Sequence, residues 1–240
     1  MKLAVSILLA ALLSPVAFAD TPRDGELVEV SSELVFIPSG FDDNDEVQVI
    51  LDGYLPNACY RMTRPEYKLD EDTGVLTVKA MARYFASPCV EALIPFTQVV
   101  EVGVLPMGNY KATTNNGDLQ KPFHIKEANN AGPDDFLYAP VEGTNVTKSR
   151  TGELLATVKG RFTDTCMQWD RSIVGDLVDG AIVIQPLMTH DPGEEFCLPV
   201  LVPFEQEITI PNGLEPGRYL LHVRSLNGKA VNRVFTVEDN

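Results

Sequence analysis

Apolar residues along this chain either alternate with polar ones or form short blocks, and turn residues separate the blocks. Representative blocks are ELVFI, VQVIL, VLTVKAM, VVEVGV, YLLHV and VFTV, bounded by Gly, Pro, Asn and Asp. A period of two is typical of half-buried β-strands, and no helical period is sustained for three turns. The pattern therefore predicts an all-β sandwich or barrel rather than a helical fold.

The pattern occurs twice along the chain. CVEALIPFTQ begins at Cys89 and CLPVLVPFEQ begins at Cys197, and both place a Pro-Phe pair and a glutamine at the same spacing. Other matching anchors, in the same order in both halves, are Cys59 and Cys166, Gly74 and Gly180, Phe96 and Phe204, Tyr110 and Tyr219, and Phe123 and Phe235. Because the gaps between anchors differ by only a few residues, we infer an internal duplication.

The duplication sets the predicted domain organisation. Residues 127–135 are polar, contain a Gly-Pro pair and have no periodic apolar pattern, so the joint between the copies falls there. We predict one β-sandwich domain over 20–127, a linker over 128–135 and a second β-sandwich domain over 136–240. An Asn-Gly pair between the last two strands of each copy predicts a hairpin turn.

The N-terminal residues have the features of an export signal. Lys2 precedes an apolar run, and Ala17-Phe18-Ala19 is the small-x-small pattern that signal peptidase accepts. We predict a signal peptide over residues 1–19. No later apolar run is long enough to span a bilayer, so we predict no membrane span. We expect an exported bacterial protein that is periplasmic or secreted.

The four cysteines of an exported chain without a C-x-x-C pair indicate two disulfides. Three pairings are possible. The repeat favours Cys59 with Cys89 and Cys166 with Cys197, because each copy would then inherit its own bridge. On the loop-entropy model each bridge stabilises its domain by roughly 3 to 4 kcal/mol.

Two short motifs carry a resemblance to a known class of fold. LPMGNY and LEPGRY end in Tyr110 and Tyr219, and they resemble the tyrosine corner of immunoglobulin-like sandwiches, with similar turns in fibronectin-III-like and transthyretin-like modules. The resemblance implies two tandem immunoglobulin-like β-sandwich domains in which both tyrosines are structural. The antibody disulfide is not implied, because both cysteines of each copy precede the tyrosine. Phe96 and Phe204, which follow a strand-starting proline, are expected to enter the cores.

The formal net charge of −15 narrows the range of partners. Acidic residues spread along the whole chain repel phosphates, so we predict no nucleic-acid partner.

The chain offers little for catalysis. It has three histidines, and no pattern of a known nucleophile, metalloprotease or nucleotide site occurs. His124 and His222 lie in predicted strands, and alternation places His222 opposite Leu221 and Val223, which predicts an exposed side chain. We therefore find no positive case for an enzyme.

Two loops are candidates for metal binding. His190, Asp191 and Glu194 share the loop THDPGEEFC, which could hold a metal or an acid-base pair, although a solvated acidic loop is the favoured interpretation. Asp42, Asp43 and Asp45 share the loop FDDNDE, and clustered carboxylates are what Ca²⁺ requires. No other cofactor is predicted.

These observations favour an exported, non-catalytic binding or assembly protein of the cell envelope. It would act through loops and edges of two disulfide-held sandwiches, with an envelope protein or a glycan as partner. Two alternatives remain open at this stage: an inhibitor of an extracellular or periplasmic hydrolase, and a metal-dependent enzyme that uses the loop around His190.

Overall fold

The computed structural model describes residues 25–191, 193 and 196–239. The predicted signal peptide and Glu194 lie outside the described residues. Within them, every regular element is a β-strand except for one short 3₁₀ turn, η1 (Asn115–Gly117). No described helix is long and apolar enough to cross a bilayer.

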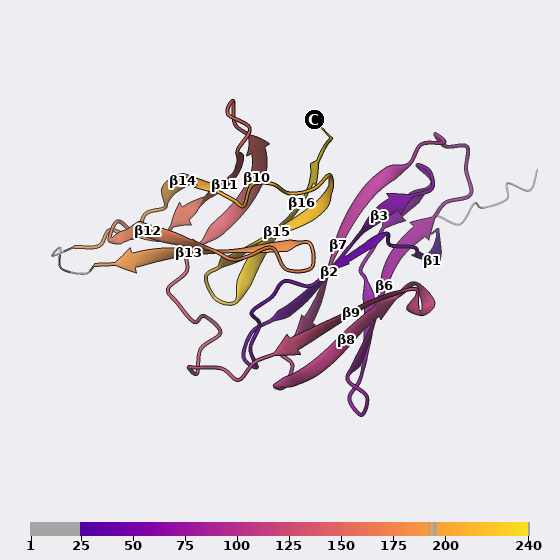
Figure 1. The fold of residues 1–240 in the computed structure, drawn as a ribbon, viewed down its shortest axis with the longest axis horizontal. Coiled ribbons are helices and arrows are strands. Elements are labelled where there is room, and N and C mark those ends of the chain that lie inside the picture. Colours follow the sequence, from indigo (N-terminus) through magenta and orange to yellow (C-terminus); the bar gives the residue numbers. More distant parts are fainter. Residues whose placement is uncertain (1–24, 192, 194–195, 240) are drawn as a thin grey trace, which may run out of the picture.

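The N-terminal copy is a sandwich of two sheets (Figure 1). The smaller sheet has the order β2-β3-β7, with β2 (Leu34–Phe36), β3 (Val47–Leu55) and β7 (Ile94–Gly103). The larger sheet is built around β6 (Val75–Tyr84). Its other strands are β1 (Glu26–Val30), β4 (Tyr60–Met62), β5 (Glu66–Asp70), β8 (Gly108–Thr114) and β9 (Leu119–Ile125).

The C-terminal copy repeats this arrangement. One sheet has the order β10-β11-β14, with β10 (Val141–Lys148), β11 (Leu154–Phe162) and β14 (Val202–Thr209). The other has the order β12-β13-β15-β16, with β12 (Met167–Val174), β13 (Ala181–His190), β15 (Gly217–Ser225) and β16 (Lys229–Val237). One strand pair is parallel in each copy, and the two pairs correspond: β6 with β8 and β13 with β15. The prediction of two tandem β-sandwiches from a duplication is confirmed.

Each copy has its own apolar core, and the repeated anchors hold matching places in it. Phe96 is buried in the N-terminal core and Phe204 in the C-terminal core. The Tyr110 hydroxyl donates a hydrogen bond to the Pro106 carbonyl (2.9 Å), and the Tyr219 hydroxyl donates one to the Glu215 carbonyl (2.8 Å). Both copies therefore have the hydrogen bond that characterises a tyrosine corner.

The two copies pack on each other through one face of each. The outer face of β3 lies against the outer face of β15, and Phe36, Ile50, Ala181 and Leu220 form a buried apolar cluster between them. Because β3 and β15 are each covered on both faces, the simple alternation of buried and exposed positions is lost along much of their length. The interface joins different sheets of the two copies, so it is not symmetric.

Charged groups are buried at this interface. Arg224 is 6% exposed and forms an ion pair with Asp45, 3.0 Å between Nη1 and Oδ2, and its Nη2 donates to the Gly40 carbonyl (2.8 Å). Arg218 pairs with Asp52 (2.6 Å) and with Glu33. Burial raises the pKa of Asp45, although the Arg224 guanidinium acts in the opposite direction.

His222 is the clearest departure from the sequence analysis. The prediction of an exposed side chain is wrong, because His222 is only 1% exposed. Alternation placed it on the correct face of β15, opposite the core residues Leu221 and Val223, but the N-terminal copy covers that face. The ring Nδ1 donates to Asn232 Oδ1 (2.8 Å), and burial lowers the pKa of His222 to about 4. By contrast, His124 is exposed as expected.

Residues 127–135 contain no strand, and side chains tie the segment to both copies. Asp43 Oδ1 accepts a hydrogen bond from the Ala128 amide (2.8 Å). The Asp134 carboxylate accepts from the amides of Asn227 (2.7 Å) and Gly228 (2.8 Å). Asn227 and Gly228 have φ angles of 63° and 69°, as a type I′ hairpin turn requires. The domain limits at 127/128 and 135/136 stay predictions.

Candidate functional site

In each copy a disulfide holds one loop against an earlier connection between strands, which joins β3 to β4 in the N-terminal copy and β11 to β12 in the C-terminal copy. In the N-terminal copy this loop connects β6 to β7, over residues 85–93, and Cys59 is bonded to Cys89. The Ala58 amide donates to the Val90 carbonyl (3.0 Å), and the Phe85 amide donates to the Cys59 carbonyl (3.0 Å). The loop is therefore fixed at its start and beyond its cysteine.

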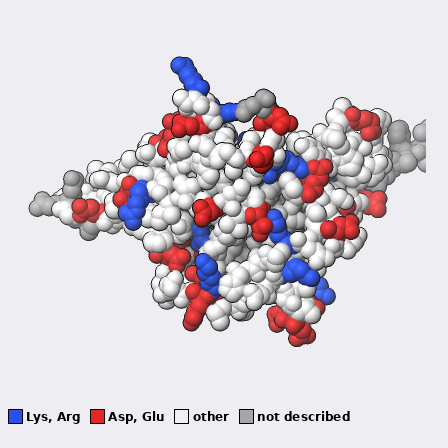
Figure 2. All heavy atoms as spheres, in the orientation of Figure 1, with Lys and Arg blue, Asp and Glu red and all other residues white. Residues whose placement is uncertain are grey.

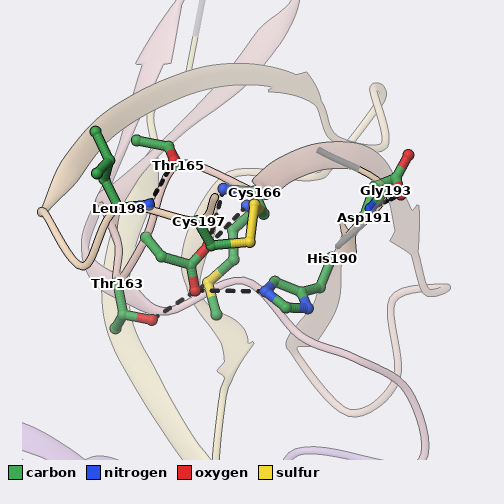
Figure 3. The surroundings of a disulfide bond; sticks show 10 residues. Thr163, Thr165, Cys166, His190, Asp191, Gly193, Cys197 and Leu198 are labelled. Atoms are coloured by element: carbon green, nitrogen blue, oxygen red, sulfur yellow. Dashed lines mark hydrogen bonds and ion pairs between the residues drawn. A yellow bond between two sulfur atoms is a disulfide. The ribbon is translucent and has the colours of Figure 1, made fainter. Parts of the chain in front are cut away.

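The C-terminal copy repeats these bonds at the matching residues. Cys166 is bonded to Cys197 in the loop between β13 and β14, over residues 191–201. The Thr165 amide donates to the Leu198 carbonyl (3.2 Å), and the Leu198 amide donates to Thr165 Oγ1 (3.0 Å; Figure 3). The Asp191 amide donates to the Cys166 carbonyl (3.1 Å). Each bridge thus lies within one copy, which is the pairing that the repeat favours.

Both loops present apolar side chains to the surroundings. Phe196 is 81% exposed although it directly precedes a disulfide cysteine. The other exposed large apolar residues of the two loops are Val90, Leu93, Leu198, Val200 and Leu201. Single exposed apolar residues are common on protein surfaces, whereas here several of them lie on two covalently fixed loops. We call these two segments the disulfide loops.

The disulfide loops lie at opposite ends of the molecule. In Figure 1 the described residues of the β13–β14 loop lie toward the left of the view, and the β6–β7 loop lies at the right. Each loop is therefore placed at the end of its own sandwich that points away from the interface between the copies. The molecule therefore presents two exposed apolar loops of related origin.

A polar pair, Asp164 and His190, lies beside the C-terminal disulfide loop. Asp164 Oδ2 lies 3.5 Å from His190 Nε2, while Asp164 Oδ1 accepts hydrogen bonds from the amides of Cys166 (2.9 Å) and Met167 (3.2 Å). Figure 3 shows His190 directed toward the disulfide. In the N-terminal copy Asn57 Oδ1 accepts from the Cys59 amide in the same way (3.0 Å). The second carboxylate oxygen of Asp164 thus faces His190, whereas the matching residue of the N-terminal copy is the amide Asn57.

Among the described residues of the predicted metal loop, His190 lies beside the carboxylate of Asp164 rather than that of Asp191. Asp191 Oδ1 accepts from the Gly193 amide (2.8 Å), and the carboxylate near His190 is that of Asp164. Cys197 Sγ lies in the same cluster, within 4.8 Å of these ligand atoms, but its sulfur is in the disulfide and is not a thiolate. The described residues thus supply one imidazole and one carboxylate, and a catalytic zinc takes three protein ligands. Metal binding here stays a prediction.

The carboxylates of the FDDNDE loop already have protein partners. Asp42 and Asp45 are about 5% and 4% exposed, and Asp45 Oδ2 accepts from the Asp42 amide (3.1 Å). Asp45 also pairs with Arg224, and Asp43 accepts from Ala128. Their positions give them a structural role at the interface and the linker. Calcium binding at this loop stays a prediction.

Sequence reasoning missed the exposed apolar residues of the disulfide loops. CVEALI and FCLPVLV look like strand-forming blocks, and only the position of the loops at the ends of the sandwiches shows that these side chains remain uncovered. The signal that could have found them is their place directly around the second cysteine and before the Pro-Phe pair at the start of the next strand.

The surface has no feature of a polyanion-binding site in the view of Figure 2. Acidic side chains are distributed over this face, and basic side chains lie among them rather than in one patch.

Taken together, the two duplicated sandwiches and their matching disulfide loops define an all-β protein of tandem modules. A family model for the ORF11 beta-sandwich domain matches residues 49–125 and again residues 156–237. The chain belongs to this family, and both copies match it separately. No curated protein and no solved structure matches the chain.

Proposed function

We propose that the chain is an exported, non-catalytic binding or assembly protein of the cell envelope that contacts its partner through the disulfide loops. The observation that carries this proposal is the exposure of large apolar side chains, above all Phe196, on loops that a disulfide holds in place. A preorganised loop loses little conformational entropy on binding, so its apolar area contributes more fully to affinity.

The chemistry of the loops favours a protein partner over a glycan. Their exposed residues are mainly aliphatic: Val90, Leu93, Leu198, Val200 and Leu201. Aliphatic side chains gain by entering apolar pockets of a protein surface, whereas sugars are held by polar groups and by the flat faces of aromatic rings. Phe196 is the one aromatic residue among the exposed large apolar side chains of these loops.

Export to the periplasm or the medium is part of the same proposal. Two disulfides are expected in an oxidising compartment and are rare in the cytosol. The signal pattern over residues 1–19 supplies an independent reason from the sequence. Intact-mass analysis of the native protein tests both, because a chain starting at Asp20 with two bridges gains about four hydrogens on reduction.

The binding proposal is tested with loop variants of the tagged protein in its native envelope extract. We expect Phe196→Ser with Leu201→Ser, and Val90→Ser with Leu93→Ser, each to lose a partner that the unmodified chain retains. The matched control is Val104→Ser with Met107→Ser, which replaces residues that are 56% and 57% exposed outside the disulfide loops. Circular dichroism establishes that all variants remain folded.

Two results would contradict the proposal. One is recovery of no specific protein at any of several salt concentrations. The other is equal recovery with the loop variants and with the control variant, because the disulfide loops would then not be the contact surface. A partner released by free oligosaccharide would instead identify a glycan as the bound group.

Inhibition of a hydrolase is the second candidate. A rigid loop with a projecting apolar residue, such as Phe196 beside Cys197, has the form of a segment that enters an active site. Assays of the purified chain against a panel of extracellular proteases and lysozymes test it. Inhibition that Phe196→Ser abolishes would favour this candidate over assembly.

A further inference from the structure

In each copy the two sheets meet along a seam between two edge strands. These strands are β2 and β9 in the N-terminal copy, and β10 and β16 in the C-terminal copy. The outer side of an edge strand carries backbone groups without a ladder partner, so a further extended segment can pair there.

The N-terminal copy closes its seam with its own chain. The connection from β2 to β3 contains Phe41, which is 4% exposed and belongs to the core. The Asp43 amide donates to the Lys126 carbonyl (3.0 Å), and the Lys126 amide donates to the Phe41 carbonyl (3.1 Å). Residues 41–43 thus pair in parallel with the chain just after β9. We call residues 40–43 the closing segment.

The described residues of the C-terminal copy include no such segment. Its connection from β10 to β11 is a tight turn, in which the Ser149 amide donates to the Glu153 carbonyl (2.8 Å). Among the described residues, none forms a bridge with Glu238, which follows β16 as Lys126 follows β9. A groove of about 670 Å³ lies along β10, the end of β16 and the loop around Leu214.

Matching apolar residues around the seam are buried to different extents in the two copies. Four positions around the seam are buried in the N-terminal copy, and their counterparts lining the groove in the C-terminal copy are only partly buried. The pairs are Ile37 and Val146, Val47 and Leu154, Leu105 and Leu214, and Ile125 and Val237. The C-terminal core is therefore uncovered at the place where Phe41 covers the N-terminal core.

From this comparison we propose that the groove binds an extended peptide segment of a partner protein, in the place that the closing segment occupies in the N-terminal copy. The peptide backbone pairs with the chain at Glu238, and a large apolar side chain covers Val146, Leu154 and Leu214. This is recognition by strand addition, in which backbone hydrogen bonds give affinity and a side-chain pocket gives specificity. The inference goes beyond the proposed function, because it uses no residue of the disulfide loops.

The N-terminal copy also specifies the chemistry of the peptide. Its closing segment has Gly40 before Phe41 and acidic residues after it. A ring of this size buried against apolar side chains contributes most of the expected affinity, since full burial of a phenylalanine is worth a tenfold or greater change in binding. The groove has the size of a typical small-ligand site.

The probe is a synthetic peptide of residues 37–45, IPSGFDDND, titrated into the ¹⁵N-labelled full chain and followed by NMR. We expect saturable shifts of the amide resonances of Val146, Phe235 and Glu238. The same peptide with Phe41→Ala should bind at least about tenfold more weakly. Unchanged resonances at millimolar peptide, or equal affinity of the two peptides, would overturn the proposal.

A grafted variant is the matched control. Replacing residues 149–153 with residues 40–46 gives the C-terminal copy its own closing segment, so peptide binding should disappear and the Glu238 amide should gain protection from hydrogen exchange. If the graft does not fold, Val146→Asp, on an edge strand, removes the apolar floor instead. Retained binding in either folded variant would place the peptide elsewhere and contradict the proposal.

Two further readouts distinguish a partner peptide in the groove from a second copy of the chain and from binding at the disulfide loops. Shifts of the groove resonances on dilution of the chain without peptide would identify a second copy as the occupant and overturn the partner assignment. Phe196→Ser with Leu201→Ser should bind the peptide as the unmodified chain does. Failure of the disulfide-loop proposal would therefore not affect the groove proposal, and failure of the groove proposal would not affect the disulfide-loop proposal.

Discussion

The outer faces of the two copies differ far more than their folds. Gln48, Ile50 and Asp52 on the outer face of β3 are buried at the interface, while the matching positions of β11 in the C-terminal copy are Leu155, Thr157 and Lys159, which are partly buried or exposed. On β15 the buried outer residues are Leu220, His222 and Arg224, and their counterparts in the N-terminal copy are Lys111, Thr113 and Asn115. Each copy thus has one face specialised for the other.

The seams between the two sheets also differ between the copies. The N-terminal copy closes its seam with residues 40–43, and the C-terminal copy leaves a groove there. The closing segment also contributes to the interface, because Gly40 accepts from Arg224 and the Phe41 ring lies against His222. The difference teaches that a duplicated fold retains its strand order and bridges, while contact between the copies decides which surfaces become interior.

The largest expected effect comes from Arg224, whose counterpart in the other copy is the partly buried Asn115. Arg224→Met leaves the carboxylate of Asp45 buried without its cation, so the free energy of unfolding should fall by about 3 to 5 kcal/mol. Urea denaturation measures it, with the exposed Arg233→Met as control. Adding Asp45→Asn should restore part of the loss, and a loss below about 1 kcal/mol would show that the interface does not depend on this pair.

Removal of each disulfide should cost nearly the same in both copies. The bridged cysteines are 30 and 31 residues apart, so Cys59→Ser with Cys89→Ser and Cys166→Ser with Cys197→Ser should each lower the free energy of unfolding by roughly 3 to 4 kcal/mol. Denaturation of the two double variants side by side measures it. Losses that differ by more than about 2 kcal/mol would mean that the bridges do more than close loops of equal length.

His222 should make stability depend on pH. The pKa of His222 is lowered by burial and by nearby Arg224 to about 4, against 6.5 for the unfolded chain. The unfolded state therefore binds the proton first, and stability falls as the pH drops from 6.5 to 4, by about 3 kcal/mol. His222→Gln should remove this part of the pH profile, which urea denaturation at a series of pH values measures. A profile unaltered by His222→Gln would contradict the assignment.

The smallest effect should come from the tyrosine corners. Tyr110→Phe and Tyr219→Phe each delete one hydroxyl that donates to a backbone carbonyl, so each should lower the free energy of unfolding by about 1 kcal/mol. Thermal unfolding of the two variants tests whether the corners are equivalent. A loss at only one of them would show that the repeated motif has kept its role in one copy.

Several features of the fold could be predicted because they depend on local pattern or on repetition. Alternating blocks indicated strands, the Asn227-Gly228 pair indicated a hairpin turn, and the repeated cysteines favoured one bridge in each copy. The candidate site could be predicted only in part from the sequence. The cysteines marked the disulfide loops, but apolar residues such as Phe196 could not be told from core residues without knowing what covers them.

The sequence by itself determined the all-β class, the duplication and the tyrosine motifs, because these follow from residue period and spacing along the chain. Only the tertiary structure decided the burial of His222, the pairing of Arg224 with Asp45 and the open groove beside β16. The physical reason is that alternation assigns a side chain to one face of a strand, whereas its exposure depends on a second surface packed against that face. Here that second surface is the other copy at the interface, and the closing segment at the N-terminal seam.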